Sequence, residues 1–348
     1  MVSSLGKGGA ERSSALLSQM FYDVGYDVHI VCILNKIEFP YKGKLLNLGV
    51  LKAENDTFLG RWNRLRVLKH YLKTQNFDFV IDNRTRIGFL KEFIVSKCIY
   101  TPKKTIYCVR SYRVDYYINP KRFLGRLLYG NAYKIVTVSK TISKKIKETY
   151  NFKNVTTIYN AVTSEAISKE NSTRDYILFF GRIDDDIKNI SLLLEGYRTS
   201  NLPDQKINLK ILGDGKDVEK LKTQAKELNL AAHVQFTPHN PDPSTLIKSA
   251  LFTVLTSKYE GFPRSIIESL ALGTPVISVD CKSGPNEIIQ NGTNGLLIEN
   301  HNPEALAEAM NQLFGDKDLY LHCKANSKSS VTQFSEANIL QQWQNLLN

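Results

Sequence analysis

The chain has 348 residues, which is more than one compact core usually serves, so the sequence predicts two domains. Hydrophobic residues make up 42% and charged residues 23%, a usage that excludes disordered and fibrous chains. No apolar run approaches the roughly 18 residues of a membrane-spanning helix, and the first residues lack the apolar core of a signal peptide. Five scattered cysteines without a C-x-x-C pair argue against a disulfide framework or a zinc site and favour the cytoplasm.

The formal net charge of +12 is distributed unevenly along the chain. Residues 1–155 contain 28 Lys and Arg and 11 Asp and Glu, a net charge of +17, whereas residues 156–348 carry a net charge of −5. The first half is therefore expected to face an anionic partner. No nucleic-acid recognition signature accompanies the charge, so the favoured partner is an anionic membrane surface. A solvated basic face without a partner is the alternative.

Short apolar runs alternate with helical patterns in both halves, which predicts parallel sheets covered by helices on both faces. The expected strands are residues 28–34, 77–82, 103–109, 134–139, 176–181, 207–213, 233–237, 251–256 and 274–279. The expected helices are residues 11–24, 61–73, 190–199, 216–229, 244–250, 263–272, 285–290 and 303–314. Each half thus reads as a doubly wound, Rossmann-like domain.

We expect an N-terminal domain over 1–158, a second domain over 159–330 and a polar linker near 156–175. The last segment, 331–348, has an apolar stripe that needs a surface to cover it, so we expect a C-terminal helix that packs back on the N-terminal domain.

The strongest motif is SKYEGFPRSIIESLALGTPVIS at 257–278, which reads as a loop, a helix and the start of a strand. Pro263 is suited to the first turn of the helix, and Gly273 to its left-handed end. The free backbone N–H groups at such a helix start favour a phosphate or sugar ligand. Glu260 in the loop and Glu268 in the helix then contact different parts of that ligand. The alternative is a solvated Glu260 and an ordinary surface Glu268.

This motif resembles the E-x(7)-E element of the retaining glycosyltransferases of family 4, which have the GT-B fold. The likeness extends over nearly the whole chain, because other segments match the family in type and order. These are SLGKGGAER (4–12), FFGRIDDDIKN (179–189), LKILGDG (209–215) and SGPNEII…NGTNGLLI (283–298). The resemblance implies two Rossmann-like domains that face each other across a cleft.

The resemblance also implies roles for particular residues. Arg182 and Lys188 are expected to neutralise the donor diphosphate in place of a metal ion, so no cofactor is expected. Glu260 is expected to contact the donor sugar, and Glu268 the ribose hydroxyls. The remaining expected donor-binding residues are Gly8, Gly9, Gly181, Gly261, Phe262, Pro263 and Arg264.

An acidic run in one of these segments offers a second interpretation. Asp184, Asp185 and Asp186 imitate a metal site, but their place between Arg182 and Lys188 favours a solvated acidic turn.

The chain departs from the family pattern at two places. Many members carry a histidine after the fourth strand of the first domain, where this sequence has Arg110, a candidate contact to the sugar or the acceptor. Only Met1 and Val2 precede the glycine loop, so either the start lies upstream or the first strand is curtailed. His239, in a polar loop, is a candidate contact to the nucleotide base.

The function implied is a metal-independent retaining hexosyltransferase with a nucleotide-sugar donor, most simply a UDP-sugar. Its acceptor is expected to be lipid-linked or a polysaccharide, in the assembly of bacterial surface glycans at the inner face of the membrane. The alternatives are a non-catalytic sugar-nucleotide-binding subunit and a GT-B-fold epimerase.

Two basic amphipathic segments, 61–73 and 121–128, are candidates for membrane contact. The alternative is that their apolar residues are buried against the domain's own sheet.

Overall fold

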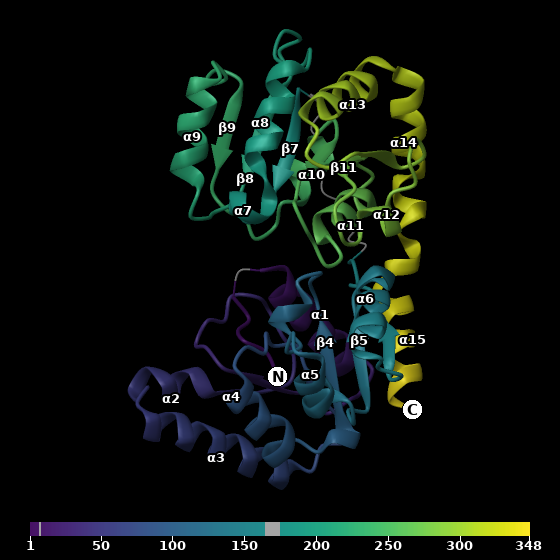
Figure 1. Ribbon diagram of the computed structural model, residues 1–348. Coiled ribbons are helices and arrows are strands. Elements are labelled where there is room, and N and C mark those ends of the chain that lie inside the picture. Colours follow the sequence, from purple (N-terminus) through teal and green to yellow (C-terminus); the bar gives the residue numbers. More distant parts are fainter. Residues whose placement is uncertain (7, 164–174) are drawn as a thin grey trace. The chain divides into compact units, whose positions relative to one another are not determined.

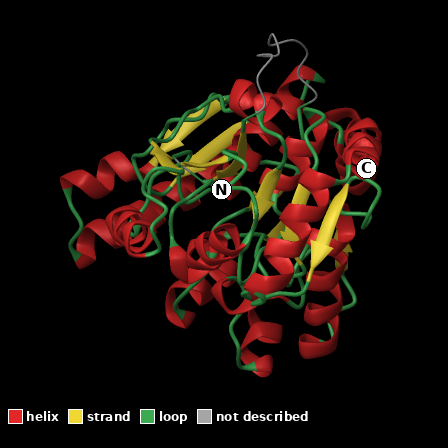
Figure 2. Cartoon of the chain, turned by 90° about the horizontal axis from the view of Figure 1, so that it is seen from above, coloured by secondary structure: helices red, strands yellow, loops and turns green. Residues whose placement is uncertain are grey.

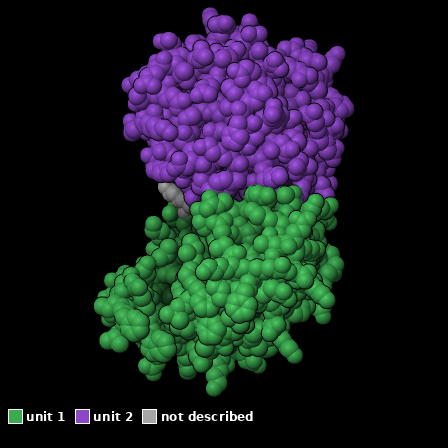
Figure 3. Space-filling view, viewed as in Figure 1, with its two compact units in different colours: residues 1–161, 336–348 green, residues 162–335 purple. Residues whose placement is uncertain are grey.

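The computed structural model describes residues 1–6, 8–163 and 175–348. Contacts divide the chain into two compact units, which Figure 3 shows in different colours. Unit 1 comprises Met1–Ala161 together with Glu336–Asn348, and unit 2 comprises Val162–Ser335. The chain therefore leaves unit 1 once and returns to it at the end. Most of the expected linker, 164–174, lies outside the described residues, and its first residues belong to a strand of unit 1.

Unit 1 is an α/β domain built on parallel strands (Figures 1 and 2). Four strands pair in the order β3-β4-β5-β6, and β1 pairs with β2. The strands are β1 (His29–Cys32), β2 (Lys44–Asn47), β3 (Val80–Asp82), β4 (Thr105–Val109), β5 (Lys134–Thr137) and β6 (Val155–Thr157). The helices are α1 (Gly9–Asp23), α2 (Leu48–Glu54), α3 (Phe58–Gln75), α4 (Phe89–Ile94), α5 (Arg122–Tyr129), α6 (Lys140–Tyr150) and α15 (Glu336–Leu347).

The first residues of the chain lie between β1 and β3 and link the two sets of strands. Val2 forms a parallel bridge with Cys32, and the amide of Val2 donates to the Val31 carbonyl at 2.9 Å. On the other side, the amide of Asn83 donates to the Met1 carbonyl at 2.9 Å. Residues 1–3 thus occupy the place of a short central strand.

Unit 2 contains one parallel sheet of six strands in the order β12-β11-β10-β7-β8-β9. The strands are β7 (Tyr176–Phe180), β8 (Asn208–Leu212), β9 (Val234–Thr237), β10 (Thr253–Leu255), β11 (Val276–Val279) and β12 (Gly295–Ile298). The helices are α7 (Asp185–Lys188), α8 (Ile190–Thr199), α9 (Val218–Glu227), α10 (Ser244–Ser249), α11 (Arg264–Ala271), α12 (Pro285–Ile288), α13 (Pro303–Gly315) and α14 (Lys317–Ser330). The order changes direction between β7 and β10, where ligands of open α/β sheets bind.

Each unit has its own hydrophobic core, as two independent Rossmann-like domains require. In unit 2 the core includes Phe179 of β7 and Leu306 of α13, both almost fully buried. In unit 1, α15 packs against α1, and the ring of Trp343 meets that of Phe21 edge to face at 6.1 Å. Among the described residues, none of the helices is long and apolar enough to cross a bilayer.

Candidate active site

Two glycines keep the backbone close together at the carboxyl edge of the unit 2 sheet. Gly181 follows β7 with φ +148°, and Gly213 follows β8 with φ +152°, a backbone conformation that L residues rarely adopt. A Cβ added to Gly213 would lie 1.8 Å from the carbonyl oxygen of Gly181. The loops after β7 and β8 therefore need glycine at both positions.

Lys188 and Glu260 form an ion pair at this edge. The Nζ of Lys188, in the last residue of α7, lies 2.5 Å from Oε1 of Glu260, in the loop after β10. The hydroxyl of Ser257 donates to the same oxygen at 2.7 Å. The side chains are 20% and 14% exposed, so the pair is partly shielded from water. The structure brings together two residues that the sequence placed in one site.

The two loops that carry this pair are joined by their backbones. The hydroxyl of Thr256 donates to the Lys188 carbonyl at 3.0 Å, and the amide of Lys258 donates to the Ile187 carbonyl at 2.8 Å. These bonds fix the end of α7 against the loop after β10.

Arg182 lies in the loop before α7 and is exposed. Within the described part of the chain it forms no ion pair, so its guanidinium remains available to an anionic ligand. Its backbone carbonyl accepts the amide of Asp184 at 3.1 Å, which makes the tight turn leading into α7.

The Gly261-Phe262-Pro263 turn is anchored from the loop after β11. The hydroxyl of Ser283 donates to the Gly261 carbonyl at 2.8 Å. The Phe262 ring is buried and meets the Phe334 ring edge to face at 5.0 Å, so its side chain serves the core. The backbone of this turn, rather than the phenyl ring, is what the segment offers to a ligand.

Arg264 orients Glu268 on α11, one turn further along. Its Nε and one terminal nitrogen lie 3.0 and 2.8 Å from Oε1 of Glu268. The helix ends as expected at Gly273, with φ +83°. Because both side chains are largely buried, the ion pair holds the carboxylate in one position.

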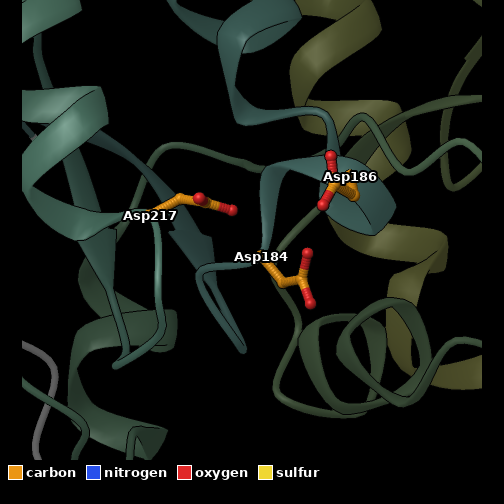
Figure 4. A group of neighbouring side chains, drawn as sticks. All are labelled: Asp184, Asp186 and Asp217. Atoms are coloured by element: carbon orange, nitrogen blue, oxygen red, sulfur yellow. The ribbon is translucent and has the colours of Figure 1, made fainter.

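Three aspartates of unit 2 have carboxylate oxygens close enough to hold a metal ion: Asp184, Asp186 and Asp217 (Figure 4). An ammonium group already lies among them, since Nζ of Lys216 is 2.5 Å from Asp186 and 3.4 Å from Asp184. The hydrogen bond from Lys216 lowers the pKa of Asp186, and that bond raises the pKa of Lys216. The cluster is thus partly neutralised by the chain itself.

Asp185, the middle residue of the acidic run, does not belong to this cluster. It accepts the Ser191 amide at 2.8 Å and pairs with Lys220 at 2.9 Å. It therefore stabilises the start of α8. The acidic run 184–186 therefore has two roles in the fold: Asp184 and Asp186 belong to the cluster, and Asp185 holds the start of α8.

His239 lies in the loop after β9, at the same carboxyl edge. Its backbone amide donates to Oδ1 of Asp214 at 3.2 Å, which ties this loop to the one after β8.

In unit 1 the candidate residues lie at the carboxyl edge of that unit's own sheet. Gly8 precedes α1 and Gly9 is its first residue, so the helix starts two residues earlier than expected. Arg110 follows β4, where Nε donates to Asn83 at 2.8 Å and one terminal nitrogen donates to Asn160 at 2.9 Å. Lys7, between the glycines of the loop, lies outside the described residues.

Sequence reasoning missed four residues that hold the candidate groups: Ser257, Lys216, Asn83 and Asn160. Ser257 is the first residue of the recognised motif and was therefore the easiest of the four to identify. The two asparagines lie 27 and 50 residues from Arg110, so no local pattern links them.

Residues 162–330 match the model of the family described as Glycosyl transferases group 1. An uncharacterised glycosyltransferase of Haemophilus influenzae is 27% identical, over 98% of this chain and 96% of its own length. A Campylobacter jejuni N-acetylgalactosamine-N,N'-diacetylbacillosaminyl-diphospho-undecaprenol 4-alpha-N-acetylgalactosaminyltransferase is 26% identical, over 97% and 95%. These names support glycosyltransferase activity for this chain. They also support a place for it among proteins of bacterial glycan biosynthesis.

Solved structures show the same fold. Anabaena HepE in complex with UDP-glucose aligns with a TM-score of 0.80 at 16% identity, over 99% of this chain and 98% of that chain. TarM aligns with a TM-score of 0.74 at 18% identity, over 100% and 98%. The architecture is therefore GT-B, as the sequence predicted.

Proposed function

We propose that this chain is a metal-independent retaining glycosyltransferase that moves a hexosyl group from a nucleotide-sugar donor to a lipid-linked or polysaccharide acceptor. The observation that carries the proposal is the Lys188–Glu260 pair at the carboxyl edge of unit 2, with Arg182 beside it in the chain and the Arg264–Glu268 pair on α11. The setting we propose is the assembly of bacterial surface glycans. It is supported by the Campylobacter jejuni relative, which is named for a diphospho-undecaprenol acceptor, and by a relative from Erwinia amylovora, which is named for amylovoran biosynthesis.

Sugar transfer needs charge stabilisation at two places. Breaking the bond between the anomeric carbon and the diphosphate oxygen leaves negative charge on the diphosphate and positive charge on the sugar ring. Arg182 and Lys188 stabilise the first, because charge-assisted hydrogen bonds to phosphate are strong. The Glu260 carboxylate, held by Lys188 and Ser257, stabilises the second and contacts the donor sugar.

Donor recognition is assigned to the neighbouring backbone and to Glu268. The Glu268 carboxylate, oriented by Arg264, accepts hydrogen bonds from the ribose hydroxyls. Gly181 and the Gly261–Pro263 turn let the donor approach the backbone closely, and His239 flanks the base. We propose UDP as the nucleotide, because solved structures of the same fold contain UDP and UDP-glucose.

The experiment is turnover of radiolabelled UDP-sugars on lipid-linked acceptors, with and without EDTA. Label should move to the lipid fraction at the same rate in both, and the anomeric configuration of the product should be that of the donor. A chain that binds UDP but moves no label on any acceptor would be the non-catalytic subunit instead. Loss of activity in EDTA that Mg²⁺ restores would assign the Asp184–Asp186–Asp217 cluster to a metal.

We further propose that the enzyme associates peripherally with the inner face of the membrane, through α3, α4 and α5 of unit 1. Among the described residues, the large apolar side chains that are exposed lie almost all in unit 1, and Leu321 is the exception. On these helices they include Phe58 at 81% exposure, Trp62 at 50% and Phe123 at 75%.

Charged residues accompany these apolar side chains. Arg66 and Lys69 on α3 and Arg122 and Arg126 on α5 are exposed. Arg64 is different, because it pairs with Asp56 at 2.7 Å and is largely covered. Leu68 and Leu128 are buried, as the alternative interpretation of these helices expects. Trp62 and Phe123 are exposed, and this exposure supports the proposed membrane contact.

A further inference from the structure

Arg110 is held at the carboxyl edge of the unit 1 sheet by two neutral side chains. Its Nε donates to Oδ1 of Asn83, which follows β3, at 2.8 Å. One terminal nitrogen donates to Oδ1 of Asn160, which follows β6, at 2.9 Å. The guanidinium is thus fixed from both sides of β4.

The partners of Arg110 orient its charge but do not neutralise it. Within the described residues, its side chain forms no ion pair with a carboxylate. Other arginines of unit 1 do: Arg84 pairs with Asp82 at 2.7 Å, and Arg113 with Asp115 at 2.9 Å. A half-buried, pre-oriented cation at an edge where such sheets bind ligands is suited to an anion.

The space beside the guanidinium limits where that anion can lie. Arg110 and Asn160 line a cavity of about 20 Å³ whose other walls include Leu17, Met20 and Trp343. That volume accommodates about one water molecule. The ligand therefore lies outside the cavity, at the sheet edge.

We propose that Arg110 is the residue of unit 1 that recognises an oxyanion on the acceptor, a phosphate or a carboxylate group. The inference rests on the proposed function, because it assigns the acceptor to unit 1 and the donor to the cations of unit 2. The planar fork of arginine matches both groups geometrically, whereas a neutral sugar hydroxyl needs no such charge.

Binding of two probe anions tests this in the full chain, with saturating UDP present to fill the donor site. The probes are inorganic pyrophosphate, for a lipid-linked phosphate, and glucuronate, for an acidic sugar, with glucose as the neutral match of glucuronate. The variants are Arg110→Gln, which removes the charge, and Arg110→Lys, which keeps it without the fork. Arg113→Gln is the matched control, since the side chain of Arg113 is 43% exposed and pairs with a carboxylate, that of Asp115. Thermal melts establish that each variant is folded, and UDP is titrated separately.

Arg110→Gln should weaken binding of at least one anion about tenfold or more, as for a lost charge-assisted hydrogen bond. Arg110→Lys should weaken it less, Arg113→Gln should leave it unchanged, and which anion responds identifies the source of the group. Equal affinity of wild type and Arg110→Gln for both anions overturns the proposal, as does an equal loss for glucose. Failure of the proposed function would appear differently, as a failure of UDP to bind to the wild-type chain.

Discussion

Lys188 Nζ and Glu260 Oε1 lie 2.5 Å apart, although the two residues are separated by 72 positions in the chain. The pair joins the end of α7, which follows β7, to the loop after β10. Strands β7 and β10 are neighbours in the sheet of unit 2. The cation and the carboxylate assigned to the donor diphosphate and the donor sugar are therefore mutually oriented by the fold.

We expect Arg182→Ala and Lys188→Ala each to lower kcat/KM by about 100-fold or more, as for one lost transition-state donor. Lys258→Ala is the matched control, because Lys258 is an exposed lysine of the adjacent loop. The rates are measured with EDTA present. Near-normal turnover in both Arg182→Ala and Lys188→Ala would show that these cations do not stabilise the donor diphosphate.

The two glutamates should separate binding from turnover. Glu268→Gln should weaken the affinity for free UDP, since it removes the ribose contact and the charge that Arg264 holds. Glu260→Gln should lower kcat with nearly unchanged UDP affinity. Calorimetric titration with UDP, next to initial rates, makes the comparison. An equal loss of UDP affinity in both variants contradicts the assigned roles.

The buried ion cluster of Asp82, Arg84 and Arg86 in unit 1 should make the free energy of unfolding fall at acidic pH. Burial by itself would raise the pKa of Asp82, but the charges of Arg84 and Arg86 outweigh it and hold the pKa at about 2. Because this value is below the ordinary 3.8 of an unfolded chain, the ionised Asp82 stabilises the fold above about pH 4. The stabilisation is lost as the pH falls toward about 2.

Replacement of Asp82 tests this cluster. Asp82→Asn should lower the free energy of unfolding by about 3–5 kcal/mol at pH 7, because the buried Arg84 and Arg86 both lose the Asp82 carboxylate and Arg84 keeps, among the described residues, only Glu92, at 3.3 Å. Urea unfolding between pH 7 and pH 3 measures the difference, with the exposed Asp186→Asn as the control. A variant as stable as wild type at pH 7 would contradict the role given to the ion cluster.

The C-terminal helix should stabilise unit 1. Trp343→Ala removes a ring that is 3% exposed and packs on Phe21, so we expect a loss of about 3–5 kcal/mol. Gln341→Ala, on the exposed face of the same helix, is the control. Deletion of 336–348 should have a larger effect, and hydrogen exchange should locate it in α1. A truncated chain that melts like the full one would disprove this.

Vesicle co-sedimentation tests the membrane proposal. Binding should require anionic lipid and fall steeply as salt rises through about 0.15 M, where the Debye length is near 8 Å. Replacing Arg66 and Lys69 by Gln, or Trp62 and Phe123 by Ala, should weaken it, whereas Leu321→Ala in unit 2 should not. Binding that ignores lipid charge and salt, or that is absent at low salt, contradicts the proposal.

The sequence predicted two Rossmann-like domains because strands and helices are local patterns, and the GT-B fold followed from the resemblance of its ordered motifs to a known family. The strand expected at 176–181 is β7 (Tyr176–Phe180), and the helix expected at 61–73 lies within α3 (Phe58–Gln75). Helix α14 (Lys317–Ser330) was missed, because its apolar residues are too few to give a helical stripe. The sequence does carry one indication of the start of α14: Asp316 is an N-cap residue, and its side chain accepts a hydrogen bond from the Leu319 amide.

The candidate site was predictable only as a set of residue types. Which side chains contact one another depends on strand order, which single-sequence patterns do not give. Lys216 among the aspartates is an example: it lies 30 positions from Asp186, and only the neighbouring positions of β7 and β8 bring the two together.

The return of the chain to unit 1 has a consequence for synthesis on the ribosome. Translation completes every residue of unit 2 before it reaches Glu336, so unit 2 has its full core while unit 1 still lacks α15. Until α15 emerges, Phe21 of α1 lacks the Trp343 ring that packs on it, and this part of the unit 1 core is exposed to chaperones and to aggregation. Unit 1, although most of it precedes unit 2 in the chain, is therefore completed after unit 2.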